Sequence, residues 1–236
     1  MKGSALVNRV QRSPNIEPRP DGRIPRYLIL HYTGMATGNA AADWLCNPAS
    51  KVSCHYLVDD DGTIVQMVDE DMRAWHAGVG SWHGEIDINS TSIGIEIQNQ
   101  GHAAGSPAFP AMQMTRVAEL SRDIMQRHHI PPENVLAHSD IAPGRKIDPG
   151  EHFDWDWLAG HGVGVVVKAS GRAVMSVTTL QESLAQLGYG IEATGTNDPH
   201  TIKVTEAFQR HYRRSRVDGV ADAETCDVIR RLLASI

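Results

Sequence analysis

A strict alternation of apolar and polar residues over residues 92–99 places the strongest constraint on the fold of this chain. The segment reads Ser-Ile-Gly-Ile-Glu-Ile-Gln-Asn, with the isoleucines on one side and Gly94, Glu96 and Gln98 on the other. A period of two is the period of a β-strand, and an apolar face needs a core to cover it. The sequence therefore predicts a strand whose isoleucine face packs against other elements.

Three further segments have the pattern of strands. Residues 27–31 form a short apolar run that ends at His31, which is typical of a buried strand, and residues 135–138 form another. Residues 55–68 hold two runs rich in β-forming residues around an Asp-Gly turn, which predicts a hairpin. These strands are expected to share one sheet with residues 92–99.

Helical spacing of apolar residues occurs over residues 37–46 and 114–128, and a proline follows each segment as a stop. Strands and helices are thus mixed along residues 25–160, which indicates an α/β or α+β domain with helices packed on a sheet. Residues 1–24 are polar and contain prolines, and we expect them to form a loose arm.

The composition changes after residue 160, where glycines accumulate without periodicity, so we place a linker at residues 161–175. Residues 176–236 then carry a leucine stripe followed by Gly188, a typical helix end. The pattern Gly-x-x-Asp-x-x-Thr occurs twice, at residues 195–201 and 219–225, and each aspartate is a good N-cap. We expect a small all-α domain of three helices, suited to binding rather than catalysis.

Charge and composition exclude several classes of protein. Lys and Arg total 22 against 28 Asp and Glu, a formal net charge of −6 that argues against a dedicated nucleic-acid binder. No stretch approaches the ~18 consecutive apolar residues of a membrane span. The three cysteines do not make a disulfide framework, and the sequence does not decide whether Cys46 and Cys54 pair.

Candidate zinc ligands stand at the ends of the predicted strands. A catalytic zinc ion needs three protein ligands and one open position. His31 and His138 each end a strand, and Asp148 follows in a loop rich in turn residues. Asp140 is a rival carboxylate because it lies on the same segment as His138. A purely structural role is the commoner use of a single histidine at a strand end.

Glu96 and Lys146 are candidates for catalytic work beside such a metal. Glu96 stands opposite the isoleucines and next to Gly94, where a carboxylate could act as a general base; a solvated outer face is the alternative. Lys146 lies two residues before Asp148, so an extended segment places both side chains on one side. Its ammonium could stabilise an oxyanion, and an ordinary surface lysine is the alternative.

These residues fall in five segments that resemble, in the same order, the zinc-dependent N-acetylmuramoyl-L-alanine amidases of the type 2 family. The segments are residues 28–33, 53–56, 74–78, 92–96 and 138–150. The resemblance covers about residues 25–158 and implies a mixed β-sheet flanked by helices, with zinc in a groove at one edge.

The resemblance also implies roles for single residues. It makes His31, His138 and Asp148 the zinc ligands, in preference to Asp140, and it makes Glu96 and Lys146 the catalytic pair.

The segment of residues 74–78 matches a part of the family pattern near the substrate groove, which suggests Trp75 and His76 as substrate-binding residues. Packing in the core is the alternative for Trp75, and a hydrogen-bonded structural role is the alternative for His76. His55 is expected to be structural, because a catalytic zinc ion keeps one position open.

The C-terminal segment resembles a peptidoglycan-binding module of the three-helix type. Together the two resemblances imply a zinc hydrolase that cleaves the amide between the lactyl group of N-acetylmuramic acid and L-alanine of the stem peptide. Peptidoglycan or muropeptides are then the partners, and no protein partner is implied. The alternatives are a protein that recognises muropeptides without cutting them and a zinc peptidase acting within the stem peptide.

Two expectations concern surroundings rather than chemistry. A module for polymeric wall favours the cell envelope or periplasm, whereas residues 1–20 lack the apolar core of a classical export signal, which favours the cytoplasm or another export route. The segment of residues 98–111, rich in Gly, Ala and Pro, is expected to be a mobile loop over the site.

Overall fold

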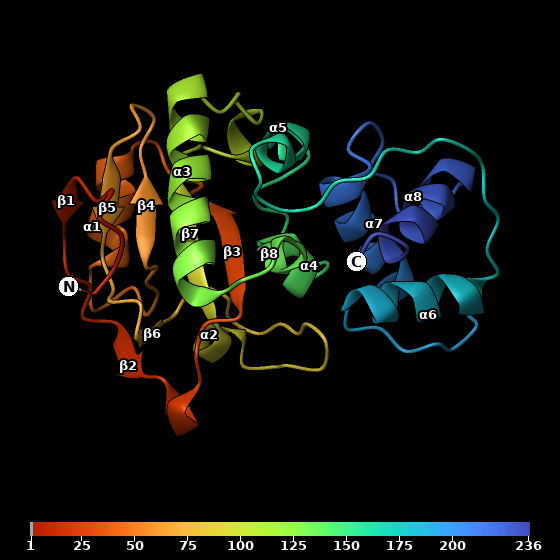
Figure 1. Cartoon of the computed structure of the whole chain (residues 1–236), viewed down its shortest axis with the longest axis horizontal. Coiled ribbons are helices and arrows are strands. Elements are labelled where there is room, and N and C mark those ends of the chain that lie inside the picture. Colours follow the sequence, from red (N-terminus) through yellow and green to blue (C-terminus); the bar gives the residue numbers. More distant parts are fainter. Residues whose placement is uncertain (1) are drawn as a thin grey trace.

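A computed structural model describes residues 2–236 and shows a sheet with helices on its faces beside a bundle of helices at the C-terminal end (Figure 1). The strands are β1 (Arg9–Val10), β2 (Ile16–Pro18), β3 (Tyr27–Tyr32), β4 (Tyr56–Val58), β5 (Ile64–Gln66), β6 (Met72–Ala74), β7 (Ser92–Ile97) and β8 (Val135–Ala137). The α-helices are α1 (Gly38–Leu45), α2 (Ile88–Thr91), α3 (Ala111–His128), α4 (His138–Ile141), α5 (Trp155–Gly160), α6 (Val177–Leu187), α7 (Pro199–Tyr212) and α8 (Ala223–Leu233).

The main sheet has six strands in the order β1-β5-β4-β7-β3-β8. β3 runs parallel to β7 and β8, whereas β4 and β5 form the antiparallel hairpin that the Asp-Gly turn predicts. The mixed sheet flanked by helices is confirmed, and so are the strands expected from residues 27–31, 92–99 and 135–138. The carboxyl ends of the parallel strands β3, β7 and β8 therefore lie at the same edge of the sheet, and the residues that follow these strands lie close together there.

Each face of the sheet has its own cover. Leu28, Leu30 and the isoleucines of β7 face the long helix α3 in one apolar cluster. Ile29 and Leu136 point to the opposite face and pack with apolar residues of α6, α7 and α8. The period-two expectation for β7 is thus confirmed, and the C-terminal helices complete the core on the face that carries Gly94 and Glu96.

The N-terminal segment differs from the expected loose arm. β1 pairs with β5 in parallel, and β2 pairs with β6 in antiparallel, so residues 9–18 extend the sheets. The Arg19 guanidinium donates hydrogen bonds to the backbone carbonyls of Glu70, Asn89, Ser90 and Ser92. The prediction failed because strand pairing and carbonyl contacts use backbone groups, which leave no apolar pattern in the sequence.

Capping residues determine where the three C-terminal helices begin and where α6 ends. The side chains of Ser176, Asp198 and Asp222 accept hydrogen bonds from backbone N–H groups in the first turns of α6, α7 and α8. Gly188 ends α6 in the left-handed region at φ 119°, where a side chain would be strained. The expected N-caps and the glycine helix end are confirmed. Among residues 2–236, no helix has both the length and the apolarity to cross a membrane, and the cysteines are free thiols.

Candidate metal centre and active site

The candidate site lies at the carboxyl ends of β3, β7 and β8, on the face of the sheet opposite α3. A cavity of about 370 Å³ opens there. His31, Glu96, His138, Lys146, Asp148, Trp75 and His76 all line it. The structure therefore brings these seven candidate residues together at one cavity. His31 and Glu96 are direct neighbours across the parallel pair of β3 and β7.

Three buried side chains converge on one point. His31 Nδ1 lies 2.8 Å from His138 Nδ1 and 3.2 Å from Asp148 Oδ2, and His138 Nδ1 lies 3.0 Å from Asp148 Oδ2. His31, His138 and Asp148 also form the group of three whose ligand atoms lie within 4.8 Å of one another. In a tetrahedral zinc site, ligand atoms are about 3.3 Å apart. The observed spacing is close to that value.

The second nitrogens of both rings are already committed as donors. His138 Nε2 lies 2.9 Å from the carbonyl oxygen of Ala77, which can only accept, so Nε2 carries the proton. His31 Nε2 faces His76 Nδ1 at 2.9 Å, and His76 Nε2 faces Ser92 Oγ, whose hydroxyl donates to the Ile88 carbonyl at 2.6 Å. In this chain of donors His76 Nδ1 accepts and His31 Nε2 donates.

The Nδ1 atoms of His31 and His138 consequently carry no proton, and their lone pairs point at each other and at the carboxylate of Asp148. Burial, and then the neighbouring His138, lower the pKa of His31 to about 4, so the ring is neutral near pH 7. Three acceptors at 2.8–3.2 Å repel one another unless a cation lies between them. The donor set fits a divalent metal ion.

Glu96 has the environment of a general acid–base group. One of its carboxylate oxygens, Oε2, is buried and has no hydrogen-bond partner among the described residues. Burial, and then the charge of Asp148, raise the pKa of Glu96 well above its ordinary value, while Lys146 lowers it. Glu96 lines the cavity, so its carboxyl group is placed to exchange a proton with a molecule bound there.

The two residues expected near the substrate differ in their contacts. Trp75 is half-buried at the cavity, and its ring nitrogen donates to Glu17 Oε2 at 3.1 Å. His76 is buried and uses both ring nitrogens, one with His31 and one with Ser92. The geometry thus favours the structural alternative for His76, which leaves no ring nitrogen for a substrate.

The other candidates lie outside the cluster. Asp140 turns away from the cavity and accepts hydrogen bonds from Tyr189 and His211. His55 Nδ1 accepts from the Gly94 N–H at 3.0 Å, which fits the expected structural role. The segment of residues 98–111 packs beside the site, where His102 contacts Tyr32 and Glu151, and no residue of this segment lines the cavity. Its mobility stays a prediction.

Sequence reasoning missed several residues of the cavity wall, among them Trp44 and Arg145. Trp44 on α1 lines the cavity and is 49% exposed, which is unusual for a tryptophan. Arg145 donates to the backbone carbonyls of Ala77 and Val79 and so holds the segment that supports His138. A tryptophan on the polar side of a short amphipathic helix was the available signal for Trp44.

A mixed sheet that presents three convergent metal-ligating groups and an unpaired buried glutamate in one open cavity defines a hydrolase-type active site. Residues 21–151 match the family described as N-acetylmuramoyl-L-alanine amidase, and residues 175–229 match a peptidoglycan binding domain.

Individual relatives agree with these matches. The N-acetylmuramoyl-L-alanine amidase AmiD of Escherichia coli is 38% identical over 88% of this chain and 82% of its own length. The structure of AmiD in complex with anhydro-N-acetylmuramic acid-L-Ala-D-gamma-Glu-L-Lys matches at 35% identity and a TM-score of 0.80, covering 93% of each chain. AmpDH3 of Pseudomonas aeruginosa in complex with anhydromuramic pentapeptide matches at 30% identity and a TM-score of 0.75, covering 91% of this chain and 93% of that one. This chain belongs to the N-acetylmuramoyl-L-alanine amidase family and is an enzyme of that class.

Proposed function

We propose that this enzyme is a zinc hydrolase that cleaves the amide bond between the lactyl group of N-acetylmuramic acid and L-alanine of the stem peptide. The observation that carries the proposal is the convergence of two unprotonated imidazole nitrogens and one carboxylate oxygen within 3.2 Å. His31, His138 and Asp148 would hold the zinc ion, as two histidines and one carboxylate do in catalytic zinc sites.

A zinc ion held by these residues would supply a Lewis acid that activates water and polarises the amide carbonyl. Glu96 lines the cavity; its carboxylate accepts a proton from the attacking water and returns it to the amide nitrogen as the carbon–nitrogen bond breaks. Lys146 lines the same cavity, and its ammonium stabilises the negative charge that develops on the carbonyl oxygen. His76 orients His31 through the hydrogen bond between their rings.

The walls of the cavity suit a muropeptide. Trp44 and Trp75 present aromatic surface, which packs well against the apolar faces of sugar rings, while Arg145 and Lys146 add positive charge beside an anionic stem peptide. The bound ligands of AmiD and AmpDH3 are anhydromuramic peptides. We therefore include anhydromuropeptides among the proposed substrates.

We also propose that the three-helix domain binds polymeric peptidoglycan, where tethering of the enzyme raises the local substrate concentration. We therefore propose the cell envelope as its location, with the cytoplasm as the alternative.

Mass spectrometry of the products tests the proposal. Purified enzyme is incubated with muropeptides with added zinc, with a chelator, and as the His138→Ala variant. The expected products are a free stem peptide that begins at L-alanine and a sugar without peptide, and both disappear with chelator or variant.

Two other outcomes would reject the proposal. Shortened peptides that remain attached to the sugar would identify a zinc peptidase. Retained muropeptide binding without any cleavage, measured in the same zinc-loaded samples, would identify a recognition protein.

A further inference from the structure

The three-helix domain contacts the segment that carries the candidate ligand His138 through hydrogen bonds to Asp140. This carboxylate lies in α4, two residues after His138, and is completely buried. Its Oδ1 accepts the hydroxyl of Tyr189 at 2.7 Å, and its Oδ2 accepts the Nδ1–H of His211 at 2.7 Å. Both donors belong to the C-terminal domain, so a buried carboxylate of one domain is satisfied by the other.

Asp140 also fixes the turn that carries two of the candidate ligands. Its Oδ2 accepts the backbone N–H of Ala137 at 2.8 Å, directly before His138. Directly after His138, the N–H of Ser139 donates to the backbone carbonyl of Asp148 at 3.1 Å. A rotation of this turn would therefore displace both His138 and Asp148.

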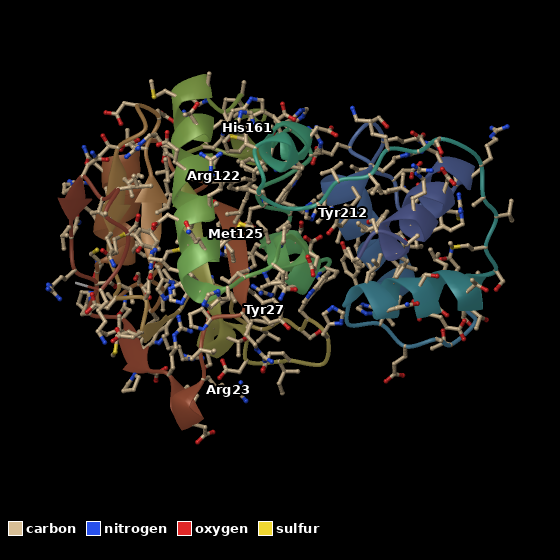
Figure 2. All side chains as sticks on the ribbon, in the orientation of Figure 1. Arg23, Tyr27, Arg122, Met125, His161 and Tyr212 are labelled. Carbon is tan, nitrogen blue, oxygen red and sulfur yellow. The ribbon has the colours of Figure 1, made fainter. Side chains whose placement is uncertain are left out.

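The donors to Asp140 are held rigidly by their neighbours. The ring of His211 is stacked between Trp155, at 3.7 Å between centroids, and Tyr212, at 3.9 Å. Tyr212 lies at the junction between the helical domain and the sheet (Figure 2). Among residues 2–236, Asp140 is the one hydrogen-bond partner of the His211 ring, whose Nε2 is buried and unpaired. Hydrogen bonds made in such a dry environment do not compete with water.

A second contact from the same domain supports His138 from another side. The N–H of His83 donates to the carbonyl of Gly188 at 2.8 Å, and the ring of Trp82 packs edge-on against Tyr189 at 4.9 Å. The same loop of the amidase domain begins at Ala77, whose carbonyl accepts the Nε2–H of His138. The helical domain therefore restrains both the backbone and the ring of this ligand.

We propose that Tyr189 and His211 are positioning residues of the metal site, which act through Asp140 so that the docked C-terminal domain raises the affinity of the site for zinc. The domain then does more than hold the enzyme on its polymer, because it preorganises the ligand set. This inference rests on the proposed function, since it requires that His31, His138 and Asp148 bind zinc.

Zinc affinity of full-length point variants tests the proposal, measured by competition with a chromogenic chelator. Tyr189→Phe removes only the hydroxyl, and His211→Phe keeps a ring between Trp155 and Tyr212 but removes the donor. We expect each variant to bind zinc about tenfold more weakly, the lower end of the effect of partners that orient metal ligands. Tyr212→Phe is the matched control, because it also removes a tyrosine hydroxyl from this junction. The Tyr212 hydroxyl makes no hydrogen bond with the described residues, unlike that of Tyr189, so this variant should bind zinc as tightly as the unmodified enzyme.

Further variants and a spectrum separate positioning from simple stability. His211→Asn restores an N–H donor at the Nδ1 position but loses the stacking, so its zinc affinity should recover while its melting temperature stays low. The visible spectrum of the cobalt-loaded enzyme should change in Tyr189→Phe and not in Tyr212→Phe, since it reports ligand geometry.

The outcomes distinguish this inference from the proposed function. If Tyr189→Phe and His211→Phe bind zinc within twofold of the unmodified enzyme, whatever their melting temperatures, the positioning role is refuted while the zinc site stands. If the unmodified enzyme does not bind zinc at all, the proposed function itself fails.

Discussion

The close approach of His76 to the backbone of β7 makes Gly94 a sensitive position. A Cβ atom added at Gly94 would lie 2.7 Å from Cγ and Nδ1 of His76 and 2.8 Å from Cys54 Sγ. Real Cβ atoms do not make contacts this short, and the ring of His76 is buried with both nitrogens hydrogen-bonded. Gly94→Ala therefore forces His76 or Cys54 to move.

The cost follows from overpacking of a closed core. An extra methyl group that displaces buried neighbours destabilises a protein by about 1–3 kcal/mol. For a chain of this size that lowers the melting temperature by roughly 2–4 °C per kcal/mol, which differential scanning calorimetry resolves. Displacement of His76 also disturbs the hydrogen bond that orients His31, so zinc affinity should fall in the same variant.

Two comparisons make the assay specific. Gly160→Ala adds the same methyl group at an exposed position with no atom within 4 Å, and it should leave both stability and zinc affinity unchanged or slightly improved. Cys54→Ala removes the sulfur atom, so the two changes at positions 54 and 94 should be less destabilising together than the sum of the single changes. A Gly94→Ala enzyme with the stability and zinc affinity of the unmodified one would refute the steric argument.

Three more predictions come from other parts of the molecule. Glu96→Gln should lower kcat by about 10²–10⁴ with zinc affinity retained, measured by steady-state kinetics on muropeptides; a kcat within threefold would exclude Glu96 as the proton carrier. Asp222→Ala should lower the free energy of unfolding by about 1 kcal/mol, because the side chain caps α8 at Thr225, and an unchanged urea midpoint would contradict this. Burial raises the pKa of Glu70, but hydrogen bonds from Arg127, His128 and Tyr56 outweigh it and lower the pKa to about 2, against 4.5 ordinarily. The ionised Glu70 then stabilises the fold by about 3 kcal/mol above pH ~4.5, and this stabilisation is lost as the pH falls toward 2. Glu70→Gln should therefore be less stable at pH 7, and its free energy of unfolding in urea should fall less steeply between pH ~4.5 and ~2 than that of the unmodified enzyme. Equal pH dependence of the two free energies would contradict this.

Local patterns were sufficient where one residue type decides the local structure. The alternation in β7 fixed which side chains face α3, and the capping aspartates marked the starts of α7 and α8. The pairing of His31 with Glu96 then follows from two parallel strands that end at one edge. Convergence of Asp148 with these residues depends on a turn, and only the family resemblance predicted it.

Contacts between distant segments were beyond local patterns. Asp140 and Asp148 are both carboxylates in the same loop region, and spacing favoured neither as a ligand. The structure separates them because Asp140 is satisfied by Tyr189 and His211, which lie 49 and 71 residues further along the chain. Burial of a carboxylate requires such partners, and a single sequence does not show which residues supply them.

The position of the site on the sheet explains why a second domain should matter for its chemistry. On the face opposite α3, one apolar cluster packs α1 against β4 and β5, and another packs the C-terminal helices against Ile29 and Leu136. His31 and Glu96 are on that same face, on the central strands β3 and β7, between the two clusters. Without the C-terminal helices, this face of the sheet would expose Ile29 and Leu136 to water next to the site. Docking of the helical domain therefore completes the core beside the cavity rather than its lining, and the domain that buries Ile29 also satisfies the carboxylate of Asp140, two residues after His138.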